Sequence, residues 1–444
     1  MAFQQYISDD QIVQAGITRD IATDMEAAWN FEQSTWATGS VTSDQFYTVP
    51  PTSLSALPGT LLKVDEAPDT AKFTLPPSTA LSRILYQTRT LNGKAVPASA
   101  FVLWPYSPRR QPDGSIPVVS WAHGTSGLFG DQGPSHLKGL SFQFGAPYTL
   151  ALQGYVVVGA DYAGLGANRT AEGQTVPHEF LANPAHANDL FYSVQAAQAA
   201  FPPLSKQFVI LGHSQGGGAA WAAAQRQAVE RVEGYLGAVA ASPVTNLFEL
   251  PADGPLFGIL TTFVVYALQY LYPEFDYRDI LTEQAAMRWE LYLQLKAGDG
   301  VGFSVLLGID LLKPDYAQNP YLRDFVSKTS NGEKAIAGPL LVLQGLADVN
   351  IDARTTTRAV QATCKAFPRS ALQYQTWEGV THNPIMFAAQ QVWLQWIADR
   401  FAGLPVGSGC QERKHRPFLP QQRYQEDANW IVEEETEIYK LAMP

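Results

Sequence analysis

The sequence is poor in cysteine and in positive charge, and both shortages exclude broad classes of protein. Only two cysteines, Cys364 and Cys410, occur among 444 residues. That is too few for a disulfide-built scaffold, and the CxxC spacing of a metal site is missing. Lysine and arginine number 30 against 41 aspartates and glutamates. No basic stripe is available to neutralise phosphates, so we expect no binding of nucleic acid.

Long apolar runs are scarce as well. The one long run, LFGILTTFVVYALQYLY at 256–272, is uncharged but shorter than the ~20 residues of a membrane span. It predicts a buried or lid-like helix and no integral membrane segment. The first residues, MAFQQYISDDQIVQAG, lack the basic and apolar regions of a signal peptide. With Met1 as the natural start we expect a cytoplasmic protein; the alternative is secretion, with a signal peptide that precedes this numbering.

Cofactor motifs are missing too. The sequence shows no metal-ligand cluster, no P-loop, and no G-x-G-x-x-G fingerprint after a strand. We therefore expect neither a metal nor a cofactor. Hydrophobic residues, by contrast, make up 46% of the chain and charged ones only 16%, which is ample for a sizeable buried core.

Short, almost wholly apolar segments recur along the chain and indicate strands buried on both faces, as in a parallel sheet. They are PVVSW (117–121), YVVVGA (155–160), QFVIL (207–211), GAVAA (237–241) and PLLVLQ (339–344), followed by LQYQTW (372–377). Segments with helical spacing lie at 185–200, 217–233, 354–367 and 385–401. Earlier, LSRILYQTR and ASAFVLW read as two strands joined by a turn at NGK. This alternation predicts an α/β fold with a mostly parallel central sheet and helices on both faces.

The alternation breaks at 245–338, a mainly helical and aromatic-rich segment between two core strands. We interpret this segment as an inserted cap or lid. The expected organisation is an N-terminal arm (1–75), a first core part (76–244), the cap (245–338), a second core part (339–410) and a C-terminal tail (411–444).

A single G-x-S-x-G motif, centred on Ser214, stands between an apolar strand and an Ala-rich helix. A nucleophile elbow requires this context, and its strained turn needs small flanking residues such as Gly212 and Gly216. The N-terminus of the following helix would direct N–H groups at an oxyanion. Ser214 is therefore the predicted nucleophile.

The partners of Ser214 are expected after it in the chain, acid before histidine. Only His382 and His415 of the seven histidines follow the serine. His382 comes directly after LQYQTW and is the predicted base, whereas His415 stands in a charged tail segment as an expected surface group. Asp348, just after PLLVLQ, is the predicted acid. Asp352 is the runner-up, although it could be the N-cap of the next helix.

Two backbone N–H donors are needed for the oxyanion. One is expected from Gln215, directly after the nucleophile, and the other from Thr125 in WAHGTSG, where Gly124 would permit close approach. His123 and His213 are expected to be hydrogen-bonded core groups. Tyr162, at the end of another strand, either lines the site or packs in the core.

Taken together, these motifs resemble the secretory lipase family of α/β-hydrolases, the lipase A type. The resemblance runs from FYTVPP through VVSWAHGTSGL, GYVVVGADYAGLG, LGHSQGGGAAW and GLADVNI to GVTHNP, and extends to Cys410. It implies the α/β-hydrolase fold, the triad Ser214, Asp348 and His382, a lid-bearing cap at 245–338, and hydrolysis of acyl esters. It also implies a disulfide between Cys364 and Cys410.

The leading hypothesis is a serine carboxylic ester hydrolase that works through an acyl-enzyme. The apolar cap favours a small-molecule, lipophilic ester, with Tyr162, Phe257, Phe263 and Tyr266 as candidate binding residues. An acyltransferase with an alcohol or amine acceptor is the alternative. The motifs do not separate the two activities, because exclusion of water by the cap decides which acceptor reacts. A non-catalytic binding protein on the same scaffold is disfavoured by the complete set of serine, histidine and aspartate.

Overall fold

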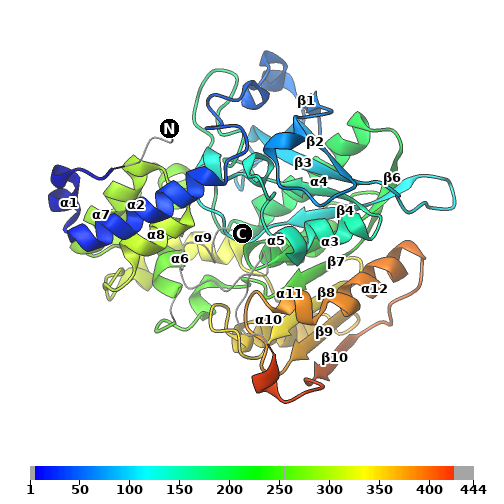
Figure 1. The fold of residues 1–444 in the computed structure, drawn as a ribbon. Coiled ribbons are helices and arrows are strands. Elements are labelled where there is room, and N and C mark those ends of the chain that lie inside the picture. Colours follow the sequence, from blue (N-terminus) through cyan, green and yellow to red (C-terminus); the bar gives the residue numbers. More distant parts are fainter. Residues whose placement is uncertain (1–5, 255, 425–444) are drawn as a thin grey trace.

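The computed structural model describes residues 6–254 and 256–424. A ten-stranded sheet runs through it in the order β1-β2-β3-β5-β4-β6-β7-β8-β9-β10 (Figure 1). The strands are β1 (Leu61–Asp65), β2 (Thr79–Arg89), β3 (Ala95–Pro105), β4 (Ile116–Ala122), β5 (Val156–Ala160), β6 (Leu204–His213), β7 (Tyr235–Ala241), β8 (Leu340–Gly345), β9 (Leu372–Trp377) and β10 (Cys410–His415). Strands β4 to β10 run parallel, while β1, β2 and β3 extend one edge in antiparallel fashion. The predicted mostly parallel sheet is confirmed.

Helices cover both faces of this sheet. Helices α4 (Asn183–Ala200), α5 (Gln215–Val229) and α10 (Ala353–Ala366) bury their apolar side chains against one face. Helices α3 (Pro147–Leu152), α11 (Ile385–Ala388) and α12 (Gln390–Phe401) do so against the other. Strands β4, β5 and β8 are buried at every position, which explains why their sequences are apolar without alternation.

The single helix expected at 385–401 is instead divided into α11 and α12 around Ala389. In an unbroken helix the carbonyl oxygen of Met386 would accept a hydrogen bond from the N–H of Gln390. Here it accepts one from the indole Nε1 of Trp393, at 2.9 Å. The Trp393 side chain thus takes over an acceptor that the helix would otherwise use.

The segment 245–338, which we predicted to be the cap, is mainly helical, as expected. It contains α6 (Phe257–Leu271), α7 (Glu283–Leu295), α8 (Asp299–Leu306) and α9 (Pro320–Thr329). The ring of Phe263 on α6 stacks on Tyr292 of α7, with centroids 5.6 Å apart, and both side chains are fully buried. Within the described residues, every helix is too short or too polar to cross a bilayer.

The N-terminal arm contacts the cap and also contributes a strand to the sheet. Its helices α1 (Asp9–Ala15) and α2 (Arg19–Ser34) lie against α7 and α8 of the cap (Figure 1). Its later residues form β1, which pairs with β2 at the edge of the sheet. The arm sequence is only weakly periodic, so it did not predict these two helices or this strand.

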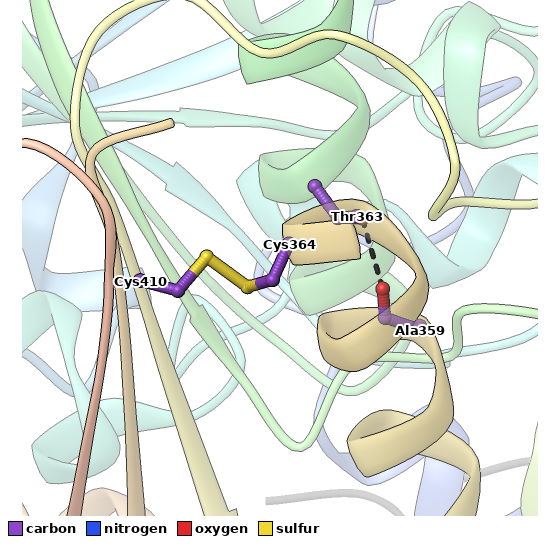
Figure 2. Close-up of a disulfide and its surroundings, with 4 residues drawn as sticks. All are labelled: Ala359, Thr363, Cys364 and Cys410. Atoms are coloured by element: carbon purple, nitrogen blue, oxygen red, sulfur yellow. Dashed lines mark hydrogen bonds between the residues drawn. A yellow bond between two sulfur atoms is a disulfide. The ribbon is translucent and has the colours of Figure 1, made fainter. Parts of the chain in front are cut away.

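The first residues of the C-terminal tail belong to the core. They form the edge strand β10, which pairs in parallel with β9. A disulfide joins Cys410 at the start of β10 to Cys364 near the end of α10 (Figure 2). His415, expected to be a surface group, is half-buried because its ring stacks on Trp377 with centroids 4.3 Å apart. Residues 425–444 of the predicted tail lie outside the described residues.

Candidate active site

Ser214 occupies a sharp turn between β6 and α5, at the carboxyl edge of the parallel strands. Its backbone is left-handed, with φ at 58°, a strained conformation for a residue other than glycine. The flanking glycines allow this geometry. A Cβ at Gly212 would lie 2.0 Å from the carbonyl oxygen of Gly216, and one at Gly216 would lie 1.9 Å from that of Ala122. The N–H of Ser214 donates to the carbonyl oxygen of Ala241 on β7, at 2.9 Å.

His382 and Asp348 come together at the same edge of the sheet. Asp348 follows β8 and His382 follows β9, and these two strands are neighbours in parallel. Nδ1 of His382 lies 2.8 Å from Oδ2 of Asp348. An imidazole nitrogen that faces a carboxylate carries a proton, so in the neutral ring Nε2 is the basic nitrogen.

Three donors fix the carboxylate of Asp348. The N–H groups of Asn350 and Ile351 donate to Oδ1 at 3.0 and 2.8 Å, and Nε2 of Gln344 donates to Oδ2 at 3.1 Å. Burial alone would raise the pKa of Asp348, yet its attraction to His382, its hydrogen bond with that ring and the hydrogen bond from the N–H of Ile351 hold the pKa below its ordinary value. Asp348 is therefore ionised at neutral pH.

Sequence reasoning did not identify the role of Gln344. Its amide is fully buried and its Oε1 accepts a hydrogen bond from Thr356 at 2.8 Å, which fixes the direction of the donor to Asp348. The signal was present in the sequence, because a single polar residue ends the otherwise apolar run PLLVLQ.

Asp352, the runner-up for the acid, is otherwise engaged. It is the N-cap of α10, where its side chain accepts from the N–H of Arg354 at 2.8 Å and forms an ion pair with the same residue. The histidine contact belongs to Asp348 alone of these two aspartates.

His213, at the end of β6, connects the strand before Ser214 to the loop that carries His382. Its Nε2 lies 3.0 Å from the carbonyl oxygen of His382, and the two rings are 4.7 Å apart at their centroids. Burial lowers the pKa of His213 to about 3, so the ring is neutral and donates through Nε2. The backbone of His382 is thereby attached to the residue beside the nucleophile.

The two predicted oxyanion donors lie on either side of Ser214. Gln215 is the first residue of α5, so its N–H has no acceptor within the helix. On the other side, a Cβ at Gly124 would lie 3.4 Å from the Cβ of Ser214 and 2.7 Å from the ring of Phe142. The loop that carries Thr125 therefore passes beside the nucleophile, and a glycine at 124 permits this approach.

The four candidate substrate-binding residues are placed in different surroundings. Tyr162 and Phe263 are fully buried, the first among histidines and the second among aromatic rings of the cap. Phe257 lines a cavity of about 510 Å³ at the start of α6. Tyr266 lines another of about 440 Å³, between the cap and the core, whose lining includes Leu128, Phe129, Leu293, Arg169 and Lys296.

Within the part of the chain that the structure describes, no three histidine, cysteine, aspartate or glutamate side chains gather in an arrangement that could hold a metal ion.

Comparison with known proteins supports the predicted family resemblance and enzyme class. The profile of the family described as secretory lipase matches residues 132–298, which confirms the predicted resemblance and supports the expected class of carboxylic ester hydrolase. No curated protein sequence shows a significant match to this chain.

Solved structures show a similar fold at low sequence identity. Candida antarctica lipase A in its closed state aligns with a TM-score of 0.65 at 17% identity, over 83% of this chain and 88% of the lipase. The rice cell wall degrading esterase LipA of Xanthomonas oryzae aligns with a TM-score of 0.61 at 21% identity, over 79% of this chain and 99% of the esterase. The predicted α/β-hydrolase fold is thus confirmed.

Proposed function

We propose that this chain, which has the α/β-hydrolase fold of lipases and esterases, is a serine hydrolase that cleaves lipophilic carboxylic esters through an acyl-enzyme. The observation that carries the proposal is the hydrogen bond of 2.8 Å between His382 and Asp348, formed at the sheet edge where Ser214 stands on its strained turn. A base, its orienting acid and a nucleophile are the three parts that acyl transfer requires.

In the proposed reaction the Ser214 hydroxyl attacks the carbonyl carbon of the ester. Nε2 of His382 takes the hydroxyl proton and passes it to the leaving alcohol, while Asp348 stabilises the imidazolium that forms in between. The N–H groups of Gln215 and Thr125 donate to the negative oxygen of the tetrahedral intermediate. Water then attacks the acyl-enzyme, its proton moves to His382 and on to Ser214, and the acid is released.

The cap supports a lipophilic substrate. Its buried side chains are mostly apolar and aromatic, and ligand sites favour interfaces between structural units. The cavity lined by Tyr266, of about 440 Å³, lies between cap and core, and Leu128 and Phe129 in its wall lie on the same loop after β4 as Thr125. We propose this cavity as part of the substrate-binding region.

We further propose that the protein is secreted. The disulfide between Cys364 and Cys410 is of a kind that persists in oxidising compartments and is rare in the cytosol. The description of the matching family as secretory lipase supports the same location.

The decisive variant is Ser214→Ala, assayed with p-nitrophenyl esters of graded acyl length and with a fluorophosphonate probe. We expect the variant to fold, to lose turnover and to lose labelling, whereas Ser327→Ala at an exposed position on α9 keeps both. Undiminished ester cleavage by Ser214→Ala would overturn the proposal. Product analysis with an added alcohol distinguishes hydrolysis from acyl transfer.

A further inference from the structure

A buried polar cluster lies directly behind both predicted oxyanion donors. It consists of His123, Tyr162, His178, His186 and the side chain of Gln215, all of them at most 1% exposed. The residues come from four places in the chain: the loops after β4 and β5, the first turn of α4, and the start of α5. We refer to these five residues as the oxyanion cluster.

Two histidines of the cluster bind the side chain of Gln215. Nε2 of Gln215 lies 3.1 Å from Nε2 of His178 and 3.2 Å from Nε2 of His186. Nδ1 of His178 lies 3.1 Å from the carbonyl oxygen of Ala163. Because a carbonyl can only accept, Nδ1 of His178 carries the proton and Nε2 is the acceptor. The Gln215 amide therefore turns its NH₂ toward the histidines and donates one hydrogen to each ring.

This arrangement requires neutral imidazoles. Burial lowers the pKa of His178 well below its ordinary value and that of His186 to about 3. Both rings therefore keep an unprotonated nitrogen for the amide of Gln215. The two rings also stack, with centroids 5.1 Å apart, which restricts their rotation.

Tyr162 binds the loop after β4, which carries Thr125. The hydroxyl of Tyr162 donates to the carbonyl oxygen of His123 at 2.8 Å, one peptide before Gly124. The Tyr162 ring stacks on that of His123 with centroids 4.4 Å apart and lies 4.5 Å from that of His186. Tyr162 has a left-handed backbone, with φ at 66°, a costly conformation for a bulky residue that surrounding contacts must maintain.

We propose that Tyr162, His178 and His186 are positioning residues that fix the two sides of the oxyanion hole relative to Ser214. The inference rests on the proposed function. The histidines fix the first residue of α5 through the side chain of Gln215, and the Tyr162 hydroxyl fixes the loop of Thr125 through the peptide before Gly124. The ring contact between Tyr162 and His186 joins the two sides. A donor held in advance stabilises the oxyanion without reorganisation during the reaction, which explains why so many polar groups are buried here.

The test uses two variants that leave the backbone N–H donors in place. Tyr162→Phe removes the hydrogen bond to the carbonyl oxygen of His123, and Gln215→Met removes the two hydrogen bonds to His178 and His186. Their kcat and KM are measured per active site, titrated with a fluorophosphonate, and the inhibition constant of a trifluoromethyl ketone is measured beside them. We expect kcat to fall on the order of tenfold or more with little change in KM, because oxyanion donors act in the transition state. The ketone, whose adduct carries the oxyanion, should bind more weakly by a similar factor.

Tyr235→Phe is the matched control, since the Tyr235 hydroxyl is also buried but has no hydrogen-bond partner and lies at the amino end of β7. It should leave kcat, KM and ketone affinity unchanged. The positioning role would be overturned if Tyr162→Phe and Gln215→Met lost only stability and kept their kcat per titrated site and their ketone affinity. The esterase proposal would then still stand. A wild-type enzyme that neither cleaves esters nor labels would instead overturn both.

Discussion

The carboxylate of Asp348 is bound on one oxygen by two backbone N–H groups and on the other by the imidazole of His382, at 2.8 Å. The backbone donors come from the turn that directly follows Asp348, so this turn positions the carboxylate independently of His382. The geometry selects one tautomer of His382 and leaves its other nitrogen as the base.

Asp348→Asn should therefore reduce kcat by about 10³- to 10⁴-fold, because the amide favours the wrong tautomer of His382 and does not stabilise the imidazolium. The measurement is kcat on a p-nitrophenyl ester, with circular dichroism to verify folding. Asp352→Asn is the matched control, since that side chain caps α10 and pairs with Arg354. Equal losses in the two variants would contradict the assignment of Asp348 as the acid.

Gly216→Ala should be among the most destabilising single substitutions in the core. Its new methyl group would lie 1.9 Å from the carbonyl oxygen of Ala122, so α5 would have to move away from β4. We expect a loss of about 3 kcal/mol or more in the free energy of unfolding, measured by urea denaturation. Gly93→Ala meets open space and has only a left-handed φ of 81°, so its cost should be about 1–2 kcal/mol. A Gly216→Ala protein as stable as Gly93→Ala would show that the elbow is not tightly packed.

The contribution of Glu32 on α2 to the free energy of unfolding should fall as the pH rises from about 4.5 to about 7. Burial raises the pKa of this carboxyl from 4.5 to about 7, against the effect of hydrogen bonds from Gly298 and Gln132, and the nearby Asp131 raises it further. The buried Asp299 faces the same spot, and its pKa is raised by burial and by Glu32. An acid with a raised pKa in the folded state favours folding at low pH, and this contribution is lost as the pH passes through the folded-state pKa.

The corresponding measurement is urea unfolding of the wild type and Glu32→Gln at several pH values. A pKa change from 4.5 to about 7 corresponds to about 3 kcal/mol, so the wild type should lose about that much relative to the variant across this interval. Parallel pH curves for the two proteins would contradict the prediction.

Reduction of the disulfide should cost stability but little activity. The bridge spans 46 residues, and loops of this length are stabilised by about 2–4 kcal/mol through the constraint on the unfolded chain. Cys364→Ser with Cys410→Ser should lower the unfolding free energy accordingly, while kcat stays near the wild-type value because the bridge lies on α10 and β10 rather than at Ser214. A large loss of kcat at full folding would contradict this separation.

The core of the fold was predictable because its residues are uniform in character. Runs such as PLLVLQ are buried on both faces, and the elbow motif needs small residues at Gly212 and Gly216 whatever surrounds them. The triad followed from chain order and from its place after strands, and the structure brings Asp348 and His382 into contact. The catalytic role of the three residues stays a prediction.

Other features depend on partners far away in the sequence. Strand β10 reads CQERKH, which has no apolar alternation, and it forms because β9 offers a free edge and Cys364 holds its first residue. The arm helices pack on the cap through contacts that no local sequence pattern predicts. Glu32, a charged residue of α2, is buried only because α8 packs over it. The contacts of His178 and His186 with Gln215 likewise form only when the loop before α4 and the first turn of α4 meet the start of α5.

Strand β10 also influences how the molecule meets its own copies. An exposed sheet edge invites pairing with another chain, and proteins blunt such edges with charged side chains. Here the outermost strand carries Glu412, Arg413 and Lys414, all exposed, and the disulfide holds its first residue, so that β10 stays paired with β9. Apart from its effect on folding energy, the bridge thereby keeps a charged strand in place as a guard against edge-to-edge aggregation.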